Sequence, residues 1–452
     1  MNKTNLIYGI NDKVPFWKNL LFAFQQFLAI IAATILVPVL VNANSGTQLL
    51  NPASALVGAG FGTLVYLLFT KFKSPVFLGS SFAFIPALSA AAVFGYFGIF
   101  FGAVIAGGVY ALLALVVKLF GTKWISKLMP PVIIGPTVAL IGLSLAGSAM
   151  NNVMNTAGGA QNYSLIHILI GVATFLITVV ASVKGGKQIK MFPFVIGVMG
   201  GYVLACIFTV IGLLAEAPAL VVVDFSSFKT IADFSTWIPD FTFVGLFKEG
   251  FTNANGTAIA AVVLGFAPVA FVVFAEHIAD HKNISSVVGE DLLQDPGLHR
   301  TLLGDGVGSI VGSFFGGCPN TTYGESVGCV AITGNASTRT IFTTAIISIV
   351  VAFFRPALAL VESMSSCSSI IGGISIALYG FIAVSGLKMF KDIDLNDNKN
   401  LFVVAAILIP GIGGLILNFG PISISSIAPA LILGIITNLL LKDKKPAGNN
   451  DQ

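Results

Sequence analysis

The stretch Gly316-Gly317-Cys318-Pro319-Asn320-Thr321-Thr322-Tyr323-Gly324-Glu325-Ser326-Val327-Gly328 decides the fold of this chain. The surrounding sequence is almost continuously apolar, so the carboxylate of Glu325 is expected at membrane depth. An unpaired charge there costs about 2.5–3.5 kcal/mol on insertion scales, which makes such a residue a functional candidate. Pro319 and the glycines prevent a regular helix, and irregular backbone at that depth is tolerated only where it is buried in protein or lines a cavity. The stretch therefore predicts one half of a binding site.

The composition indicates an all-α integral membrane protein. Of 452 residues, 56% are hydrophobic and 9% are charged, and the mean hydropathy is +0.94. Soluble domains carry about 25% charged residues. The four cysteines show no paired spacing and the four histidines form no metal-ligand pattern, so we expect no disulfide framework, no metal site and no cofactor. The first apolar span is too long for a cleaved signal peptide and is expected to remain as a helix.

Fourteen stretches of the chain are candidates to cross the membrane. Twelve are apolar over a length that spans about 30 Å of hydrocarbon, and two more are apolar but interrupted by Gly, Ser and Pro. The twelve are 20–41, 53–70, 98–118, 128–148, 164–183, 191–214, 256–279, 300–316, 337–354, 368–390, 400–418 and 421–441, and the two interrupted stretches are 75–94 and 318–334. An even count puts both termini on the same side of the membrane.

The basic residues give the orientation, because Lys and Arg concentrate in cytoplasmic loops. With the N-terminus inside, 20 of the 23 basic residues fall on the cytoplasmic side. Only Lys229, Lys248 and Arg355 fall outside, where the segment 216–250 is rich in Asp and Glu. We therefore expect a multi-pass protein of the bacterial cytoplasmic membrane with both termini in the cytoplasm.

The fourteen spans divide into two halves of seven. Residues 1–215 hold spans 1–7, residues 216–250 form an extracellular connection, and residues 251–445 hold spans 8–14. An odd number of spans per half means that the second half enters the membrane upside down, which predicts an inverted repeat. The similarity of 133–142 in span 5 to 370–380 in span 12 supports this. The broken spans 3 and 10 then fall at equivalent positions, which is the best pointer in a sequence to a transporter's site.

Span 3 supplies the second half of the site, Leu78-Gly79-Ser80-Ser81-Phe82-Ala83-Phe84-Ile85-Pro86. We expect a short extended piece followed by a half-helix, which leaves backbone N–H groups and the positive end of a helix dipole free near the midplane. A Ser- and Gly-rich face for helix packing is the alternative for either broken span alone. The match between equivalent positions favours the site.

Span 8 carries a second membrane carboxylate, Glu276. Asp280 lies one turn later on the same helical face, whereas His277 points elsewhere. The alternative is that both acids cap the cytoplasmic end of the span in water, and for Asp280 the sequence does not separate the two interpretations. Asp305, in Gly304-Asp305-Gly306 on span 9, is expected to serve helix packing or to bond the backbone.

These motifs together resemble the nucleobase–ascorbate transporter (nucleobase:cation symporter-2) family, and in particular its bacterial uracil permeases. The similarity is carried in chain order by 79–84, Ala275-Glu276-His277, Gly304-Asp305-Gly306 and 321–325. The resemblance implies a core domain of spans 1–4 and 8–11 and a gate domain of spans 5–7 and 12–14. It also implies proton-coupled uptake of uracil, and hence no enzyme activity and no nucleic acid partner.

The resemblance also implies roles for individual residues. Carried over by position, the substrate-binding set is Glu276, Glu325, Phe82, Gly324, Tyr323 and Tyr379: the glutamates accept from the base, Phe82 and Gly324 offer main-chain N–H groups, and the tyrosines lie near site and gate. Uracil presents two ring N–H donors and two carbonyl acceptors in one plane, which fits carboxylates opposite N–H groups. Glu276 is also expected to couple transport to protons, because a low dielectric favours the protonated carboxyl group.

Three positions depart from the family pattern. Asp280 stands where the resembling permeases carry a His one turn after the first glutamate, so proton coupling is expected of Asp280 together with Glu276. The usual Gln-His pair of span 1 is Gln25-Gln26, and the family signature after Glu325 has Ser326 in place of Asn. Uracil binding is expected to be intact, and the path of the proton is the feature in question.

Several alternatives remain at this point. Another nucleobase such as xanthine could be the substrate. An anion exchanger of the same architecture is less favoured, since two carboxylates would repel an anion and we expect no Lys or Arg near either broken span to compensate. An enzyme would need a metal cluster or a nucleophile–base pair. Whether the protein acts as a homodimer in the bilayer is open.

Overall fold

The computed structural model of this chain describes residues 6–156, 163–186, 189–250, 252–419, 422–424 and 427–441. The expectations for Lys3, Lys187, Lys442, Lys444 and Lys445, and for the end of the second repeat and the C-terminus, lie outside these residues.

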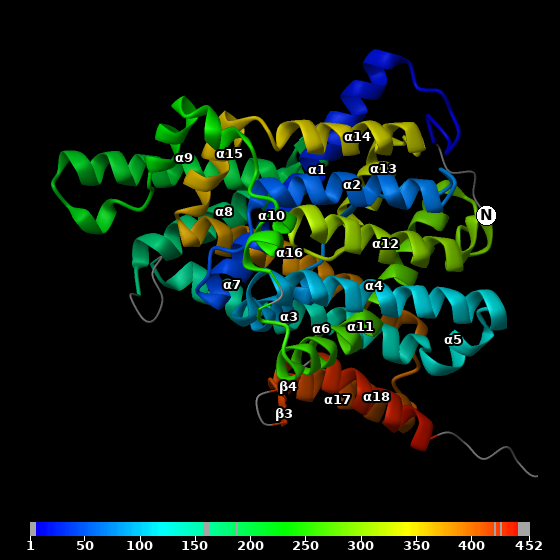
Figure 1. Cartoon of the computed structure of the whole chain (residues 1–452). Helices are drawn as coiled ribbons and strands as arrows, with labels where there is room; N and C mark the ends of the chain where they lie inside the picture. The colour runs from blue at the N-terminus through cyan, green and yellow to red at the C-terminus, as the bar shows by residue number, and fades with distance from the viewer. Residues whose placement is uncertain are drawn as a thin grey trace, which may run out of the picture.

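The chain is built mostly of helices (Figure 1). The longer helices are α1 (Phe16–Ser45), α2 (Pro52–Phe69), α4 (Gly95–Phe120), α6 (Pro131–Ser144), α8 (Leu165–Lys184), α9 (Pro193–Leu214), α11 (Gly256–Val288), α12 (Leu298–Gly316), α14 (Thr338–Val351), α16 (Ser368–Lys388), α17 (Asn398–Ile412) and α18 (Ile427–Leu440). The shorter helices are α3 (Ile85–Ala91), α5 (Lys123–Leu128), α7 (Ala146–Met154), α10 (Thr242–Glu249), α13 (Gly324–Thr333) and α15 (Arg355–Ser365). Single turns important below are η1 (Phe82–Phe84) and η3 (Ile189–Met191), and the strands are β1 (Leu78–Ser80), β2 (Asn320–Thr322), β3 (Leu417–Phe419) and β4 (Ile422–Ile424).

The helices identify a membrane protein. In the described part of the chain, eight helical segments are long and apolar enough to cross a membrane, and a ninth counts if α14 and α15, bent by 81°, form one span. A helix or a strand–helix pair overlaps each of the fourteen predicted stretches. In Figure 1 most of them run side by side, and the first described residues and the end of α18 lie towards the same right-hand side.

Helix α11 is longer than its apolar stretch. The predicted span ends at 279, whereas the helix continues to Val288 and stops at Gly289, whose positive φ of 77° suits a left-handed C-cap. The polar residues Asp280 and His281 look like a helix end in the sequence, but both side chains are buried and hydrogen-bonded. Buried partners elsewhere in the chain therefore extend the helix past the point where hydropathy falls.

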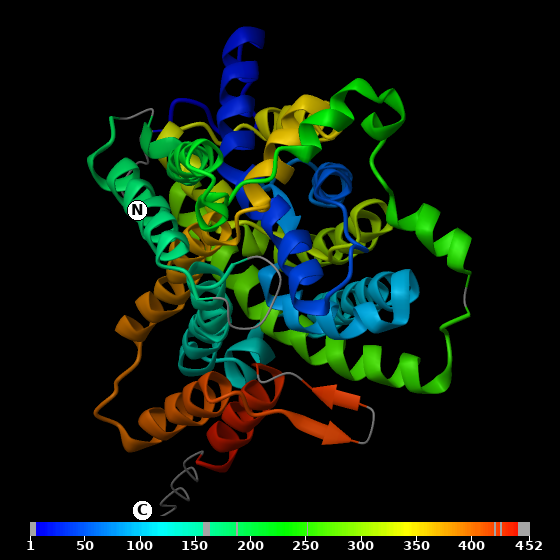
Figure 2. The same cartoon turned by 90° about the vertical axis from the view of Figure 1, so that its left-hand side faces the viewer.

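The second half ends differently from the prediction. The stretch 400–418 was expected to be one span, but α17 stops at Ile412 in a Gly-rich run, and β3 pairs with β4 as an antiparallel hairpin before α18. Figure 2, seen from the left-hand side of Figure 1, shows this orange-to-red pair of helices at the lower edge of the bundle with its hairpin beside it. Helix α15 was also not predicted. Pro356 in its first turn restarts the chain in a new direction after α14.

The two broken segments meet at the centre of the fold. β1 and β2 pair antiparallel, with Leu78 opposite Thr322 and Ser80 opposite Asn320. Each is followed by a short helix, η1 then α3 after β1 and α13 after β2. The prediction of an extended piece followed by a half-helix is confirmed for span 3, and span 10 has the same form. Pairing with each other satisfies strand backbone groups that would otherwise be left without partners at membrane depth.

Glycines allow α2 and α12 to approach closely enough to hold β2. A Cβ at Gly58 of α2 would collide with the carbonyl oxygen of Gly312 of α12, and a Cβ at Gly316 would collide with that of Ser54. Small residues at such contacts bring helix backbones together in membrane proteins. The Asn320 side chain in turn donates to the Gly58 carbonyl at 3.1 Å, and Ser309 of α12 donates to the Asn320 carbonyl at 2.5 Å.

This contact predicts opposite effects for two Gly-to-Ala changes. Gly58→Ala places a methyl group against backbone that cannot move without separating two helices, so we expect a loss of about 1–3 kcal/mol in stability. Gly108→Ala on α4 meets no atom within 4 Å and should be neutral or stabilise the helix by up to about 1 kcal/mol. Thermal unfolding of both purified variants in detergent tests this, and equal midpoints would show that the contact is not limiting.

Candidate functional site

A cavity of about 400 Å³ opens where the two broken segments meet the other helices. One wall comes from η1, β2, α13 and α11, and the opposite wall from η3, the start of α9 and the second half of α16. Its volume lies in the range of roughly 300–1,000 Å³ that small-molecule sites occupy. Five of the six residues predicted to bind a substrate line it: Phe82, Glu276, Tyr323, Gly324 and Glu325.

The two glutamates present free acceptors to this cavity. Glu276 is on α11 and Glu325 is in the first turn of α13, and both side chains are half-buried. Among the described residues, neither carboxylate receives a hydrogen bond from another side chain. Each can therefore accept from a bound molecule without first losing a bond to another side chain, although the Glu325 carboxylate also interacts with its own backbone N–H.

Backbone donors stand beside these acceptors. Helix α13 begins at Gly324, and the first N–H groups of a helix have no intrahelical acceptor. The positive end of its dipole points the same way. Gly324 is itself exposed to the cavity, so a ligand can approach its backbone closely. Phe82 opens η1 on the other broken segment, and its N–H is likewise at a helix start. Donors from two half-helices and acceptors from two carboxylates thus face one space.

Two aromatic residues stabilise this arrangement in different ways. Tyr323 is buried and donates its hydroxyl to the Ser80 carbonyl at 2.9 Å, which ties the end of β2 to β1. Tyr379 of α16, the sixth predicted binding residue, does not line the cavity. Its ring meets the edge of Phe82 with centroids 5.8 Å apart. Tyr379 therefore reaches the site through Phe82 in this conformation.

Asp280 belongs to the cavity and not to a solvated helix end. It lies inside α11, lines the same space as Glu276, and is buried with 7% of its surface exposed. Its Oδ2 accepts a hydrogen bond of 2.8 Å from the Thr322 hydroxyl of β2. The alternative that Asp280 caps the helix in water is therefore wrong, because the helix runs two further turns beyond it.

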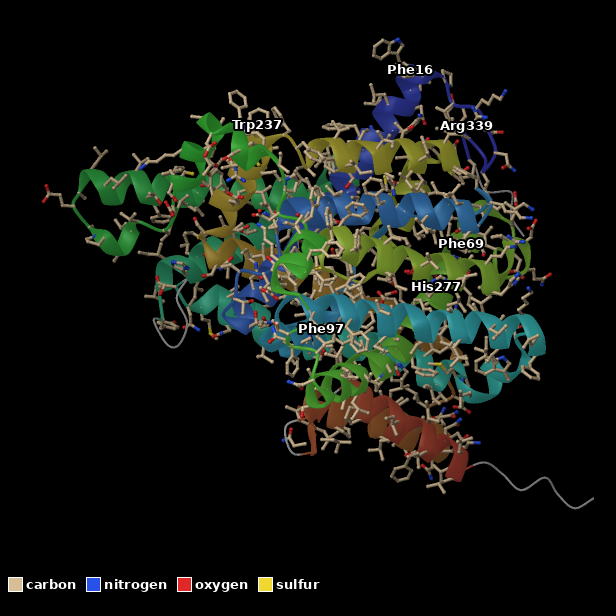
Figure 3. The ribbon with its side chains drawn as sticks, in the orientation of Figure 1. Phe16, Phe69, Phe97, Trp237, His277 and Arg339 are labelled. Carbon is tan, nitrogen blue, oxygen red and sulfur yellow. The ribbon has the colours of Figure 1, made fainter. Side chains whose placement is uncertain are left out.

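His277 and Asp305 form a buried pair behind the site. His277 Nδ1 lies 2.7 Å from Asp305 Oδ2, and its Nε2 lies 3.0 Å from the Thr301 hydroxyl. Figure 3 places His277 in the interior of the bundle. Of the two roles expected for Asp305, the structure agrees with helix packing, because its partner is a side chain on α11 and the pair joins α12 to α11. His277 does point away from Glu276, as predicted. Because neighbouring residues of a helix face different sides, the sequence already indicated that His277 would contact a different part of the protein.

Two of the departures from the family pattern contact each other. Gln26 of α1 donates to the Ser326 hydroxyl at 2.5 Å, and Ser326 in turn accepts from the Phe77 N–H at 3.0 Å. Gln26 stands at the position of the usual His, and Ser326 at that of the usual Asn. The long amide reaches the short hydroxyl, so the pair joins α1 to the start of α13, next to Glu325.

The structure also brings basic residues to the cavity that sequence reasoning missed. Lys190 of η3 and Lys388 at the end of α16 line it, and both side chains are exposed. The expectation that no Lys or Arg lies near the broken spans is therefore wrong, because segments far away in the sequence fold back over them. The cavity combines acids at its inner wall with two cations from the opposite wall.

Comparisons with known proteins agree with this geometry. A family model described as "Permease family", for xanthine and uracil permeases, matches residues 17–418. A uracil permease of Bacillus subtilis (strain 168) is 38% identical, with 98% of this chain and 97% of that protein covered. A uracil permease of Bacillus caldolyticus is 36% identical, with 100% and 98% covered.

The fold is also similar to a solved transporter of low sequence identity. The transmembrane domain of a cyanobacterium bicarbonate transporter, BicA, superimposes with a TM-score of 0.59 at 14% identity, over 95% of this chain and 100% of that one. At this identity the likeness concerns the fold alone. The family match over most of the chain and the full-length relatives are what assign it, and the chain belongs to the xanthine/uracil permease family.

Proposed function

We propose that this permease takes up uracil together with protons across the bacterial cytoplasmic membrane. The observation that carries the proposal is the cavity in which Glu276 and Glu325 present free acceptors beside the helix starts at Phe82 and Gly324. Uracil offers two N–H donors and two carbonyl acceptors in one plane, and this donor–acceptor set matches it. The relatives that carry the name uracil permease support the same substrate.

The proposal includes an architecture of fourteen spans in two inverted repeats of seven, with residues 1–215 and 251–445 as the repeats and 216–250 as the extracellular connection. Spans 1–4 and 8–11 form the core domain, and spans 5–7 and 12–14 form the gate domain. Support comes from the cavity walls: η1, α11 and α13 fall in the proposed core, whereas α9 and α16 fall in the proposed gate. A site between two such units suits alternating access.

The proposed orientation puts both termini in the cytoplasm. Lys190 and Lys388, at the mouth of the cavity, both belong to the set of basic residues that the positive-inside rule assigns to the cytoplasm. The cavity would then be open to the cytoplasm and closed to the outside. Proton coupling is assigned to Glu276 and Asp280, which line the same cavity one helical turn apart.

Two other classes of substrate are also supported by specific observations. Another nucleobase such as xanthine presents the same imide edge and fits the same donors and acceptors. An anion is favoured only by the two lysines of the cavity and by the shared fold with a bicarbonate transporter. Three carboxylates in the same cavity oppose it, since like charges repel strongly where water is scarce.

Uptake of radiolabelled uracil into proteoliposomes tests the proposal directly. We expect accumulation when the outside is acidic, loss of accumulation with a protonophore, and competition by unlabelled uracil but not by sulfate. Competition by xanthine would widen the substrate range. Uptake that a protonophore leaves unchanged would contradict symport, and competition by sulfate alone would indicate an anion transporter.

Removing either acceptor should abolish binding without unfolding the protein. Glu276→Gln and Glu325→Gln each set an amide N–H against a ring N–H of uracil. An unpaired buried polar group costs about 1–3 kcal/mol, so we expect the Kd to rise about five- to 150-fold. Equilibrium binding to the purified variants measures this, with the exposed Glu290→Gln as the matched control. Near-normal binding by both cavity variants would remove them from the site.

Asp280 should affect coupling more than binding. Asp280→Asn keeps an acceptor for Thr322 but cannot release a proton. We expect the Kd for uracil to stay close to that of the wild type, since Thr322 keeps its acceptor and both glutamates are unchanged, and we expect a reduced ability to concentrate uracil in an imposed pH gradient. The exposed Asp233→Asn is the matched control. Unchanged accumulation over a range of gradients would leave Glu276 as the sole coupling residue on α11.

A further inference from the structure

A second, larger cavity of about 910 Å³ lies at the opposite end of the same helices. Its walls come from the end of α1 and the loop to α2 on one side and from α7, the end of α15 and the start of α16 on the other. In the proposed orientation this is the extracellular side, and we call this space the outer chamber.

The outer chamber and the central cavity are separated by a mostly apolar layer of buried side chains. Helix α1 contributes Ala29 to the central cavity and Val39 to the outer chamber, and α16 contributes Phe381 and Ile371 respectively. Ten residues of helix separate the two in each case, which is about 15 Å. Buried apolar side chains of both helices, such as Val37 and Leu378, fill the interval. The two spaces therefore lie at different heights along the same two helices.

The chemistry of the outer chamber is dominated by carboxamides. Six asparagines and one glutamine line it, together with several hydroxyl groups. Some of these amides have structural partners: Asn42 bonds the Leu50 backbone, and Asn51 caps α2. The side chains of Asn44, Gln48 and Asn152 make no hydrogen bond within the described residues. They are free to bond a molecule in the chamber.

The charged residues that line the outer chamber disfavour the binding of anions. Its described lining holds no Lys or Arg and includes Asp240 and Glu362. Glu362 is neutralised by Arg355, which holds both carboxylate oxygens at 2.7 Å. The remaining acid disfavours an anion, while each free carboxamide offers one carbonyl and one NH₂ group side by side. This pair matches the edge of a cyclic amide, which presents an N–H beside a carbonyl.

We propose that the outer chamber is a second binding subsite, which accepts neutral cyclic amides from outside before the apolar layer opens. Its main contacts are Asn44, at the end of α1, and Asn152, on α7, which line the chamber from two different helices. The subsite takes the same class of compound as the central site, so this inference rests on the proposed function. It adds a first selection step, against anions, at a distance from Glu276 and Glu325.

Binding to a protein whose central site is disabled tests the subsite directly. The double variant Glu276→Gln/Glu325→Gln is purified as the full chain, and saturation transfer from protein to uracil is measured by NMR. We expect transfer to persist and to fall to the level of an unrelated membrane protein when Asn44→Leu and Asn152→Leu are added. Asn253→Leu, exposed and outside the chamber, is the matched control. Absence of transfer in the central-site variant would overturn the proposal.

Uptake kinetics give a second, independent readout. In cells with an intact central site, Asn44→Leu/Asn152→Leu should raise the KM for external uracil about two- to twelvefold, the factor that one net hydrogen bond is worth. The Kd of the purified protein should stay within twofold, because the central site is unchanged. An unchanged KM would overturn the inference. A Kd that rises by the same factor as the KM would overturn it as well. If leucine prevents folding, Asn44→Ala/Gln48→Ala, both exposed, gives the same comparison.

The two proposals fail in different ways. A wild type that shows no uptake of uracil would refute the proposed function, and the NMR measurement, repeated with xanthine, would still decide whether the outer chamber binds a cyclic amide. A wild type that takes up uracil with a KM that the chamber variant leaves unaltered would refute the subsite alone.

Discussion

The pairing of β1 with β2 is the interaction on which the rest of this structure depends. Two half-helices, η1–α3 and α13, begin near the middle of the bundle after short extended strands, and hydrocarbon offers the strand backbone groups no partner. The strands supply those partners to each other, with Gly79 opposite Thr321 at the centre of the ladder. The half-helices that follow can then leave their first N–H groups free for a ligand. Without the pairing, the N–H and C=O groups of both strands would lack hydrogen-bond partners at membrane depth, and they would destabilise the fold.

The side chains around this pair show how the site is held without being filled. Tyr323 closes the ladder through the Ser80 carbonyl, Asn320 ties it to Gly58, and Gln26 fixes Ser326 at the start of α13. All of these polar side chains make hydrogen bonds within the protein that position the site. In the described part of the chain, the two glutamates make no such bond to another side chain, so the polar groups of the site divide into those that build it and those that remain for a ligand.

The sequence predicts the parts of this site that leave a local signature. Pro319 and the glycines of 316–328 break a helix wherever the chain folds, so both broken spans could be found. The family resemblance implied six binding residues, of which five line the cavity. The features that the sequence did not predict are contacts between residues far apart in the chain. Ser326 lies 300 residues from Gln26, and Lys190 and Lys388 reach the cavity only because distant segments fold over it. The hydropathy pattern suggests that the helix ends at Asp280, because hydropathy carries no information about a buried hydrogen-bond partner such as Thr322.

The long interval between the two strands has a consequence for biosynthesis. β1 and β2 are separated by about 240 residues, and a ribosome adds about 5–20 residues per second. The first strand must therefore wait roughly 10 to 50 s in the bilayer before its partner is made. During that time its backbone groups need other partners, from water, from the insertion machinery or from a chaperone. The interval in which the first strand lacks its partner therefore runs from the synthesis of Ser80 to that of Asn320, which is about half of the chain.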